Sequence, residues 1–326
     1  MATRRGPRRL GLISNPLSGA NKRRGLAEVR RLLARHPGTL HVEVRTAADV
    51  SSALREFARA EVDLVAVNSG DGTVQAVLTA LFVERPFPSL PLLALLAGGT
   101  TNMSAQDLGL PGSLIGGLRR LIRWACSGEG DAAVLSRPVL RVDHSSHPGP
   151  LCGLFVGAAG IYNGIRFFHT RVRPMGLRGD PAHLFILARF LVGLARREDA
   201  LVAPLRAEIR TDRAHLPPGD YRMLLVTTLG RLIVGARPFW NCDGGPLRLA
   251  ALGARPRKLL KALPALVRGR PSRWATPANG YVSLGAREVR LAMNGGFAID
   301  GELFQADPEK GPLLIGEGGR VEFLRV

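Results

Sequence analysis

The stretch Leu64-Val65-Ala66-Val67-Asn68-Ser69-Gly70-Asp71-Gly72-Thr73 decides the fold, because an apolar run passes directly into a glycine-rich turn. The run predicts a buried strand of a parallel sheet, and the turn predicts a tight loop that leads into a helix. The same order recurs in residues 92–102, where an apolar run precedes Gly98-Gly99-Thr100-Thr101-Asn102. Such loops gather unpaired backbone N–H groups and the positive end of a helix, which suits phosphate. We therefore expect two neighbouring parallel strands whose loops face one nucleotide.

Strands and helices alternate through the first part of the chain. The expected strands are residues 10–14, 40–45, 64–67 and 92–97, and the expected helices are residues 22–35, 49–60, 74–82 and 115–125. This alternation is typical of a parallel sheet that is covered by helices on both faces.

The pattern changes near Ser136-Arg137-Pro138, and short alternating segments dominate after that point. Gly, Pro and Asp punctuate these segments, which is typical of an antiparallel sandwich or barrel. Helical segments interrupt them at residues 181–197 and 257–267. The expected strands are residues 139–142, 151–156, 205–209, 223–228, 247–252, 281–284, 289–293, 297–299 and 313–315. The predicted fold class is α/β plus β, with a Rossmann-like parallel α/β domain in residues 1–137 and an antiparallel β-sandwich domain in residues 138–326.

The 326 residues carry 45 basic and 26 acidic side chains, which gives a formal net charge of +19. A solvated basic surface and an anionic partner, such as a nucleotide, a nucleic acid or an acidic membrane, both fit this balance. The three cysteines lack the spacing of a disulfide framework or a zinc site. No uncharged apolar run of about 18 residues is present. The closest approach to one, residues 183–195, is interrupted by Arg189 and predicts a buried or interfacial helix instead of a membrane span. With no leader segment in sight, we expect a cytoplasmic protein that is peripheral at the inner membrane face.

Four motifs in order carry a family resemblance. They are Asn15-Pro16-Leu17-Ser18-Gly19, Ser69-Gly70-Asp71-Gly72-Thr73, Gly99-Thr100-Thr101-Asn102 and Asp300-Gly301-Glu302. Together they resemble the diacylglycerol kinase catalytic family, which includes bacterial lipid kinases, sphingosine kinases and ceramide kinase. The segment Asp243-Gly244-Gly245-Pro246-Leu247 also resembles a segment of that family. A Gly-Asp-Gly-Thr loop alone is less specific, because NAD kinases and phosphofructokinases use related loops.

The resemblance implies a site for ATP and Mg²⁺ in a cleft between the two domains. It implies that the nucleotide is lined by Asn15, Ser18 and Thr46. It implies that the phosphates are held by Ser69, Gly70, Gly72, Thr73, Gly99, Thr100 and Asn102. Asp71 would support Mg²⁺ or take a proton from the acceptor hydroxyl, and Asp300 and Glu302 would supply a general base and a nucleotide or metal contact. Whether Asp71 or Asp300 is the base stays open.

Some of these residues also have a structural alternative. Asp71 could cap the helix that starts near Thr73 or hold the turn, and Asn102 could be a plain helix N-cap. Asp300 and Gly301 form a good hairpin turn signal. If Asp71 is catalytic, Asp71→Ala should lower turnover by about two decades or more and leave the fold intact.

Two positions depart from the family pattern. Met103 stands where the family usually has Asp. Tyr162 replaces the Asp of a Gly-x-Asp-Ala segment, and in the family that Asp helps to bind the acceptor or supports the site. These departures leave the identity of the lipid headgroup undetermined.

A basic segment predicts membrane contact. Residues 255–273 hold seven basic residues and no acidic one, interleaved with leucines and a valine. Each basic residue near an anionic bilayer contributes about 1 kcal/mol, so several would give reversible adsorption. A helix that packs on the sandwich and turns its basic face to water is the alternative.

The function implied by the resemblance is an ATP-dependent kinase for a hydroxyl of diacylglycerol or a related membrane lipid. A kinase for a soluble hydroxyl compound, similar to NAD kinase, is the second hypothesis, but Gly-Thr-Thr-Asn stands where an Asn-Glu element is expected. A catalytically weakened protein that binds nucleotide and membrane is the third, motivated by Met103 and Tyr162. Nucleic acid is not expected as a partner because no recognition motif is present, and a homodimer is compatible with the sequence.

Overall fold

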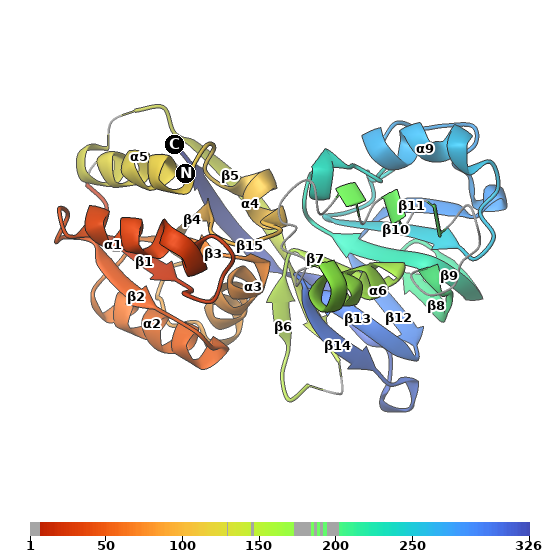
Figure 1. The fold of residues 1–326 in the computed structure, drawn as a ribbon. Coiled ribbons are helices and arrows are strands. Elements are labelled where there is room, and N and C mark those ends of the chain that lie inside the picture. Colours follow the sequence, from red (N-terminus) through yellow and green to blue (C-terminus); the bar gives the residue numbers. More distant parts are fainter. Residues whose placement is uncertain are drawn as a thin grey trace. The chain divides into compact units, whose positions relative to one another are not determined.

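The computed structural model describes residues 7–128, 130–144, 147–172, 184–185, 188–189, 192–193 and 202–326. The chain divides into two compact units (Figure 1). Unit 1 comprises Met1–Arg137 and Arg320–Val326, and unit 2 comprises Pro138–Gly319. The units part where the sequence pattern changes. The residues from Arg320 onward, which the sequence places in the second domain, belong to unit 1 instead.

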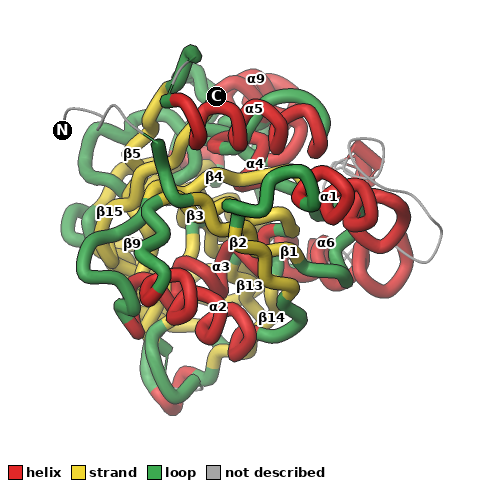
Figure 2. The backbone as a smooth tube through the Cα atoms, turned by 90° about the vertical axis from the view of Figure 1, so that its left-hand side faces the viewer, coloured by secondary structure: helices red, strands yellow, loops and turns green. Residues whose placement is uncertain are grey.

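Unit 1 is built on a parallel sheet, as expected for a Rossmann-like domain. The strands follow the order β2-β1-β3-β4, and Phe323 of β15 pairs in parallel with Leu93 at the β4 edge. The bounds are β1 (Leu10–Ser14), β2 (Leu40–Glu43), β3 (Leu64–Ser69), β4 (Leu92–Ala97) and β15 (Leu313–Arg325). In Figure 2 strands β1 to β4 lie side by side between helices.

Helices cover both faces of this sheet. They are α1 (Leu26–Leu33), α2 (Ala47–Arg59), α3 (Asp71–Thr79), α4 (Met103–Leu108) and α5 (Leu114–Ser127), with π-helical turns at Asn21–Gly25 and Ala80–Glu84. Helices α1 and α5 lie on one face, and α2 and α3 lie on the other (Figure 1). The predicted alternation of strands and helices is therefore confirmed.

The side chains of β1 alternate between the two faces of the sheet, and helices cover both faces. Leu10 and Leu12 are buried in a core cluster with Val29 of α1 and Leu118 of α5. Gly11 points to the opposite face, where a Cβ atom would lie 2.6 Å from the ring of Phe57 in α2. Because successive side chains of a strand point to opposite faces, β1 carries both layers of helices.

Unit 2 is an antiparallel β structure, which confirms the expected second half of the fold. Its main strand order is β14-β13-β7-β9-β8-β12-β15, with β10 joining β9 to β11, and β5 joining β15 to β6. The strands are β5 (Ala133–Asp143), β6 (Leu151–Gly153), β7 (Phe155–Ala159), β8 (Leu205–Thr211), β9 (His215–Thr227), β10 (Leu247–Gly253), β11 (Tyr281–Ala286), β12 (Glu288–Met293), β13 (Gly295–Ile299) and β14 (Glu302–Ala306). A buried cluster that includes Leu140, Leu224, Leu249 and Phe297 forms its core.

Among the described residues of unit 2, the helices with defined bounds are α6 (Gly160–Phe167) and α9 (Leu259–Arg268). A π-helical turn lies at Phe168–Val172, and single 3₁₀ turns lie at Ile233–Gly235, Pro277–Asn279 and Pro308–Lys310. Helix α9 confirms the helix expected in residues 257–267. Most of the helix expected in residues 181–197, including the apolar stretch 183–195, lies outside the described residues. Within the ranges given above, no helix is both long and apolar enough to cross a membrane.

Several strands differ from the sequence expectation. The expected strand 151–156 is divided into β6 and β7, β15 continues to Arg325, and β9 and β14 also differ. Strand β9 starts at His215 and runs through Pro217-Pro218-Gly219, although such a cluster predicts that a strand ends. The pairing of β9 with β8 shifts register between Ala207 and Ile209, and such a bulge lets the strand continue past residues that do not fit a regular ladder. Strand β14 has no counterpart among the expected strands, because apolar and polar residues do not alternate regularly in Glu302–Ala306.

Candidate active site

The loops that follow β3 and β4 meet at one edge of the unit 1 sheet. These strands are paired in parallel, with Asn68 opposite Leu96 and Ser69 opposite Ala97. The carboxyl ends of neighbouring parallel strands open to the same edge, where α/β proteins bind their ligands. The prediction that the two glycine-rich loops follow neighbouring strands is confirmed.

The two loops touch through glycines. A Cβ on Gly99 would lie 2.4 Å from Gly70 Cα, and a Cβ on Gly98 would lie 2.3 Å from Asn68 Oδ1. Both positions therefore exclude any side chain. A Cβ on Gly70 would meet only Gly99 Cα, at an ordinary 3.4 Å, so this side of Gly70 faces open space. The loops pack tightly on each other and leave room in front of Gly70.

Among the described residues, three backbone N–H groups of these loops have no acceptor within the chain. Gly72 lies in the first turn of α3, where the helix offers no acceptor for its N–H. In the described part of the chain, the N–H groups of Thr100 and Thr101 have no hydrogen-bond partner. The N–H of Gly99 is used, because it donates to Asn102 Oδ1 at 2.7 Å. Three donors and the positive end of α3 thus remain for an anion.

Asn102 shapes its own loop and does not cap α4. It has left-handed backbone angles, and its Nδ2 donates to Gly99 O at 3.0 Å while its Oδ1 accepts from Gly99 N. The alternative of a plain N-cap is therefore not what the structure shows. Its predicted contact with phosphate would come through the loop that it holds.

Asp71 performs the capping instead. Its side chain is buried, and its two carboxylate oxygens accept hydrogen bonds from Met103 N at 3.0 Å and Ser104 N at 2.8 Å. These are N–H groups of the first turn of α4, which has no cap from Asn102. Asp71 therefore connects the loop after β3 to the helix after β4, in addition to the catalytic or metal role predicted for it.

The loop after β1 is joined to both glycine-rich loops. Asn15 Nδ2 donates to Thr73 Oγ1 at 3.1 Å, and Ser69 Oγ lies 2.7 Å from the same oxygen. Ser18 Oγ lies 2.9 Å from Gly98 O. The structure thus brings together the predicted residues of three separate loops.

Thr100 and Thr46 differ in their surroundings. A Cβ on Gly19 would lie 2.5 Å from Thr100 Oγ1, so Thr100 sits against the first loop. Thr46 is the N-cap of α2, where its hydroxyl accepts from Asp49 N and its N–H donates to Asp49 Oδ2. The N–H groups of Arg45 and Thr46 both donate to the Asp49 carboxylate, and these hydrogen bonds hold the pKa of Asp49 below its usual range. Thr46 is exposed at the carboxyl end of β2, and its contact with nucleotide stays a prediction.

Sequence reasoning missed a buried amide network behind these loops. Asn68 is fully buried, and its Nδ2 donates to Asn21 Oδ1 and Ser14 Oγ at 3.0 and 3.1 Å. Asn21 Nδ2 has Asn15 O, Ser18 Oγ and Asn68 O within 2.9 to 3.0 Å. The signal that could have revealed it is an asparagine inside an otherwise apolar strand run, because a buried amide needs partners.

The network continues to a histidine. His41 Nε2 lies 3.0 Å from Ser14 Oγ, and burial lowers the pKa of the imidazole. On the same strand, the hydrogen bond and charge of Arg30 lower the pKa of Glu43. Around neutral pH, His41 is therefore a neutral partner in a hydrogen-bond chain that ends at the loop after β1.

Removal of either amide should destabilise unit 1. We expect Asn21→Ala and Asn68→Ala each to lower the free energy of unfolding by about 1–3 kcal/mol, because each leaves buried polar partners unsatisfied. Gln106→Ala, which removes an exposed amide, should change it by about 0.5 kcal/mol or less. Urea unfolding of the full chain measures all three. If the double variant loses the sum of the two single losses, the two amides do not act as one network.

Asp300 and Glu302 belong to unit 2. Asp300 and Gly301 both have positive φ, 45° and 93°, and close the β13–β14 hairpin between the paired residues Ile299 and Glu302. This is the geometry of a type I′ turn, so the hairpin alternative is what the structure shows. Asp300 is buried and its Oδ2 accepts from Leu154 N at 2.9 Å, whereas Glu302 is exposed. Their catalytic roles stay predictions.

The two departures from the family pattern take structural positions. Met103 is buried and gives its N–H to Asp71. The Tyr162 ring covers Gly296, where a Cβ would lie 2.3 Å from the ring, and its hydroxyl accepts from Gln305 Nε2 at 2.9 Å. Tyr162 therefore contributes packing and one hydrogen bond, where the family has a carboxylate.

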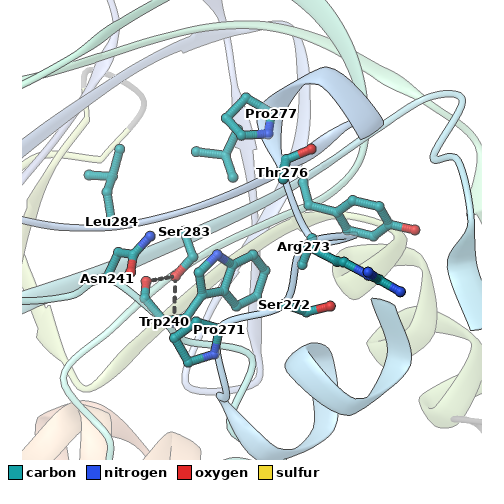
Figure 3. A pocket seen from close by; sticks show the side chains of 12 residues that line it. Trp240, Asn241, Pro271, Ser272, Arg273, Thr276, Pro277, Ser283 and Leu284 are labelled. Atoms are coloured by element: carbon teal, nitrogen blue, oxygen red, sulfur yellow. Dashed lines mark hydrogen bonds between the residues drawn. The ribbon is translucent and has the colours of Figure 1, made fainter. Parts of the chain in front are cut away.

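A pocket of about 420 Å³ lies elsewhere in unit 2, beside β11 (Figure 3). Trp240, Arg273, Thr276 and Leu284 are among its lining residues. None of the catalytic or nucleotide-binding residues predicted from the sequence is among its lining residues. In the parts of the chain that are described, no three His, Cys, Asp or Glu side chains gather closely enough to hold a metal ion by themselves.

The sequence similarity to a known protein family lies in unit 1. Residues 9–127 match the model of the diacylglycerol kinase catalytic domain. A diacylglycerol kinase of Bacillus subtilis (strain 168) is 33% identical over 106 residues, which are 32% of this chain and 34% of that protein. The chain thus matches about a third of the length of this curated relative. The resemblance inferred from the loops is confirmed for this segment.

A solved structure extends the likeness in fold to the remainder of the chain. The crystal structure of a diacylglycerol kinase from Bacillus anthracis str. Sterne aligns with a TM-score of 0.59 at 18% identity, over 98% of this chain and 96% of that one. At this identity the likeness concerns the fold alone.

Proposed function

We propose that this protein is an ATP-dependent kinase that transfers the γ-phosphoryl group to a hydroxyl of diacylglycerol or a related membrane lipid. The observation that carries the proposal is the contact between Gly70 and Gly99, which holds two glycine-rich loops side by side in a segment that matches the diacylglycerol kinase catalytic domain. Phosphoryl transfer depends mostly on positioning and charge stabilisation, and preformed loops of this kind supply both.

The phosphates of ATP would lie in the open space in front of Gly70. The N–H groups of Gly72, Thr100 and Thr101 would donate to phosphate oxygens, and the positive end of α3 would favour the negative charge. Asn15 and Ser18 would support this arrangement from the first loop. Hydrogen bonds between groups of the chain itself tie these loops together, so little ordering would be required when ATP binds.

The site fits a magnesium ion held mainly by the substrate. Mg²⁺ is usually bound by one or two carboxylates together with phosphate oxygens and water, so a cluster of three protein ligands is not required. Asp71 is the carboxylate at the loops, and an ionised carboxylate has about four acceptor positions, which makes its bonds to α4 compatible with a metal role. When bound, the ion would neutralise charge on the phosphates.

The carboxylates proposed for proton transfer are Asp71, Asp300 and Glu302. Within unit 2, the bond from Leu154 N ties the turn at Asp300 to the chain between β6 and β7, while Glu302 is exposed directly after the turn. We therefore assign Asp300 to fixing the turn, and Glu302 is the carboxylate of this motif that a substrate can reach.

Transfer of labelled γ-phosphate from ATP and Mg²⁺ to a panel of acceptors tests the function. The panel holds diacylglycerol, monoacylglycerol, sphingosine, ceramide and phosphatidylglycerol in mixed micelles, with NAD as the soluble acceptor. Label in one lipid is the expected result. Label in NAD alone would replace the lipid acceptor with a soluble one, and binding of ATP without any transfer would support a weakened site.

A further inference from the structure

Helix α9 is fixed to unit 2 by one of its faces. Ala262 and Ala265 are fully buried, and Leu259 and Leu266 pack beside them. They contact a cluster that contains Trp240, Leu252, Ala275 and Tyr281. The helix is therefore a rigid part of the unit, and its other face is turned to solvent.

That outer face is apolar. Leu260, Leu263, Pro264 and Val267 follow the i, i+3, i+4, i+7 spacing of one helix stripe. Leu260 is 84% exposed, the largest value among the large hydrophobic side chains that the structure describes, and Val267 is 42% exposed. Leu263 is half-buried and Pro264 is exposed, so packing within the unit does not account for the apolar character of Leu260, Pro264 and Val267.

Cations surround this stripe. Lys261 and Arg268 are exposed beside it on the helix. Three cations also converge on the ring of Trp274: Lys258 Nζ at 4.2 Å, Lys261 Nζ at 4.9 Å and Arg273 Cζ at 4.8 Å from its centroid. Within the described ranges none of these three forms a salt bridge, and residues 255–273 contain no acidic residue.

Like charges that gather without a carboxylate favour an anionic partner. The indole ring attracts the three cations, but it does not neutralise them. An exposed apolar stripe flanked by Lys and Arg, with a tryptophan at its border, is the pattern of a helix that lies in the interface of a bilayer. A nucleic acid would match the charges, but it would leave Leu260 and Val267 without a partner.

We propose that the outer face of α9, together with the cations around Trp274, docks the protein on an anionic phospholipid bilayer. We call this the α9 surface: Leu260, Leu263, Pro264 and Val267, with Lys258, Lys261 and Arg273. The partner is chosen in the light of the proposed lipid kinase function, but the surface follows from the exposure and charges above. It gives the enzyme a defined face toward the membrane that contains its acceptor.

Sedimentation of the full chain with vesicles tests the α9 surface without ATP. We expect binding to vesicles that contain phosphatidylglycerol, weak binding to phosphatidylcholine alone, and release by salt. The triple variant Lys258→Gln, Lys261→Gln, Arg273→Gln should weaken binding about 100-fold, since each basic residue near an anionic bilayer contributes roughly fivefold. Leu260→Ser should weaken it about tenfold through lost apolar burial.

Matched variants separate the surface from the overall charge. The triple variant Arg35→Gln, Arg59→Gln, Arg119→Gln removes the same charge from exposed positions of unit 1, and Leu90→Ser removes an exposed leucine there. Both should bind as the unchanged protein does. Thermal unfolding confirms that the variants are folded.

Three results would overturn the docking surface. They are equal weakening by the two triple variants, unchanged binding by Leu260→Ser, and binding of an RNA oligonucleotide that competes fully with vesicles. Phosphorylation of a short-chain diacylglycerol in solution keeps the two proposals apart. Vesicle binding without any such activity would support the α9 surface and contradict the proposed kinase function. Activity without vesicle binding would support the kinase function and contradict the α9 surface.

Discussion

Asp71→Ala is expected to lower turnover by about 100-fold or more, because it removes the carboxylate proposed to act on the metal or the proton at the phosphate loops. The structure adds a second effect. Two hydrogen bonds to the first turn of α4 are lost, so the free energy of unfolding should fall by about 1–3 kcal/mol. The expectation from sequence that this variant leaves the fold intact therefore needs a control for stability.

Ser113→Ala is the matched control for this effect. Ser113 caps α5 in the same unit by accepting from Gly116 N, and its loss should also lower stability, by about 1 kcal/mol. Its turnover should stay within about twofold, since it removes no charge from the loops. Both variants are measured by initial rates at saturating ATP, well below their unfolding transitions. Near-normal turnover of Asp71→Ala, or equal losses in the two variants, would remove Asp71 from the chemistry.

A pair of glycine substitutions should separate loop packing from phosphate binding. In Gly99→Ala the new methyl group would lie 2.4 Å from Gly70 Cα, so the loops must move apart, and we expect a loss of about 2–3 kcal/mol in unfolding free energy together with weaker ATP binding. In Gly70→Ala the methyl group would enter the open space in front of the loop. Stability should then change by about 1 kcal/mol or less, while ATP affinity should fall by about tenfold or more.

Urea unfolding and calorimetric titration with ATP measure the two effects on each variant. The informative comparison is Gly70→Ala, which should bind ATP poorly although it is stable. Normal ATP affinity in that variant would show that the phosphates do not lie in front of Gly70. A stable Gly99→Ala variant would show that the two loops do not need their close contact.

The parts of the fold that local sequence could predict are those whose signal lies within a few residues. The apolar runs before Asn68 and Gly98 define two buried strands, and the glycines after them define loops that the structure places side by side. The hairpin at Asp300 and Gly301 is likewise local, because both positions require positive φ. Thr46 and Asp49 are only three residues apart and form a capping box, so the start of α2 is also a local signal.

What could not be predicted depends on partners far apart in the chain. Asp71 bonds to residues 32 and 33 positions later, and Asn68 bonds to Asn21, 47 positions earlier. Neither pairing leaves a local pattern. The sequence predicts membrane contact for residues 255–273, but it does not show which leucines of α9 are exposed, because leucines lie on two sides of this helix.

The pairing of Phe323 with Leu93 has a consequence for the order in which the protein is made. Phe323 and Leu324 are fully buried in unit 1, yet the ribosome produces them only after all of unit 2. The β4 edge of unit 1 therefore lacks the pairing with Phe323 while unit 2 is synthesised. An unpaired strand edge is a template for association with other chains. Completion of unit 1 is in this way delayed until residues 320–326 leave the ribosome.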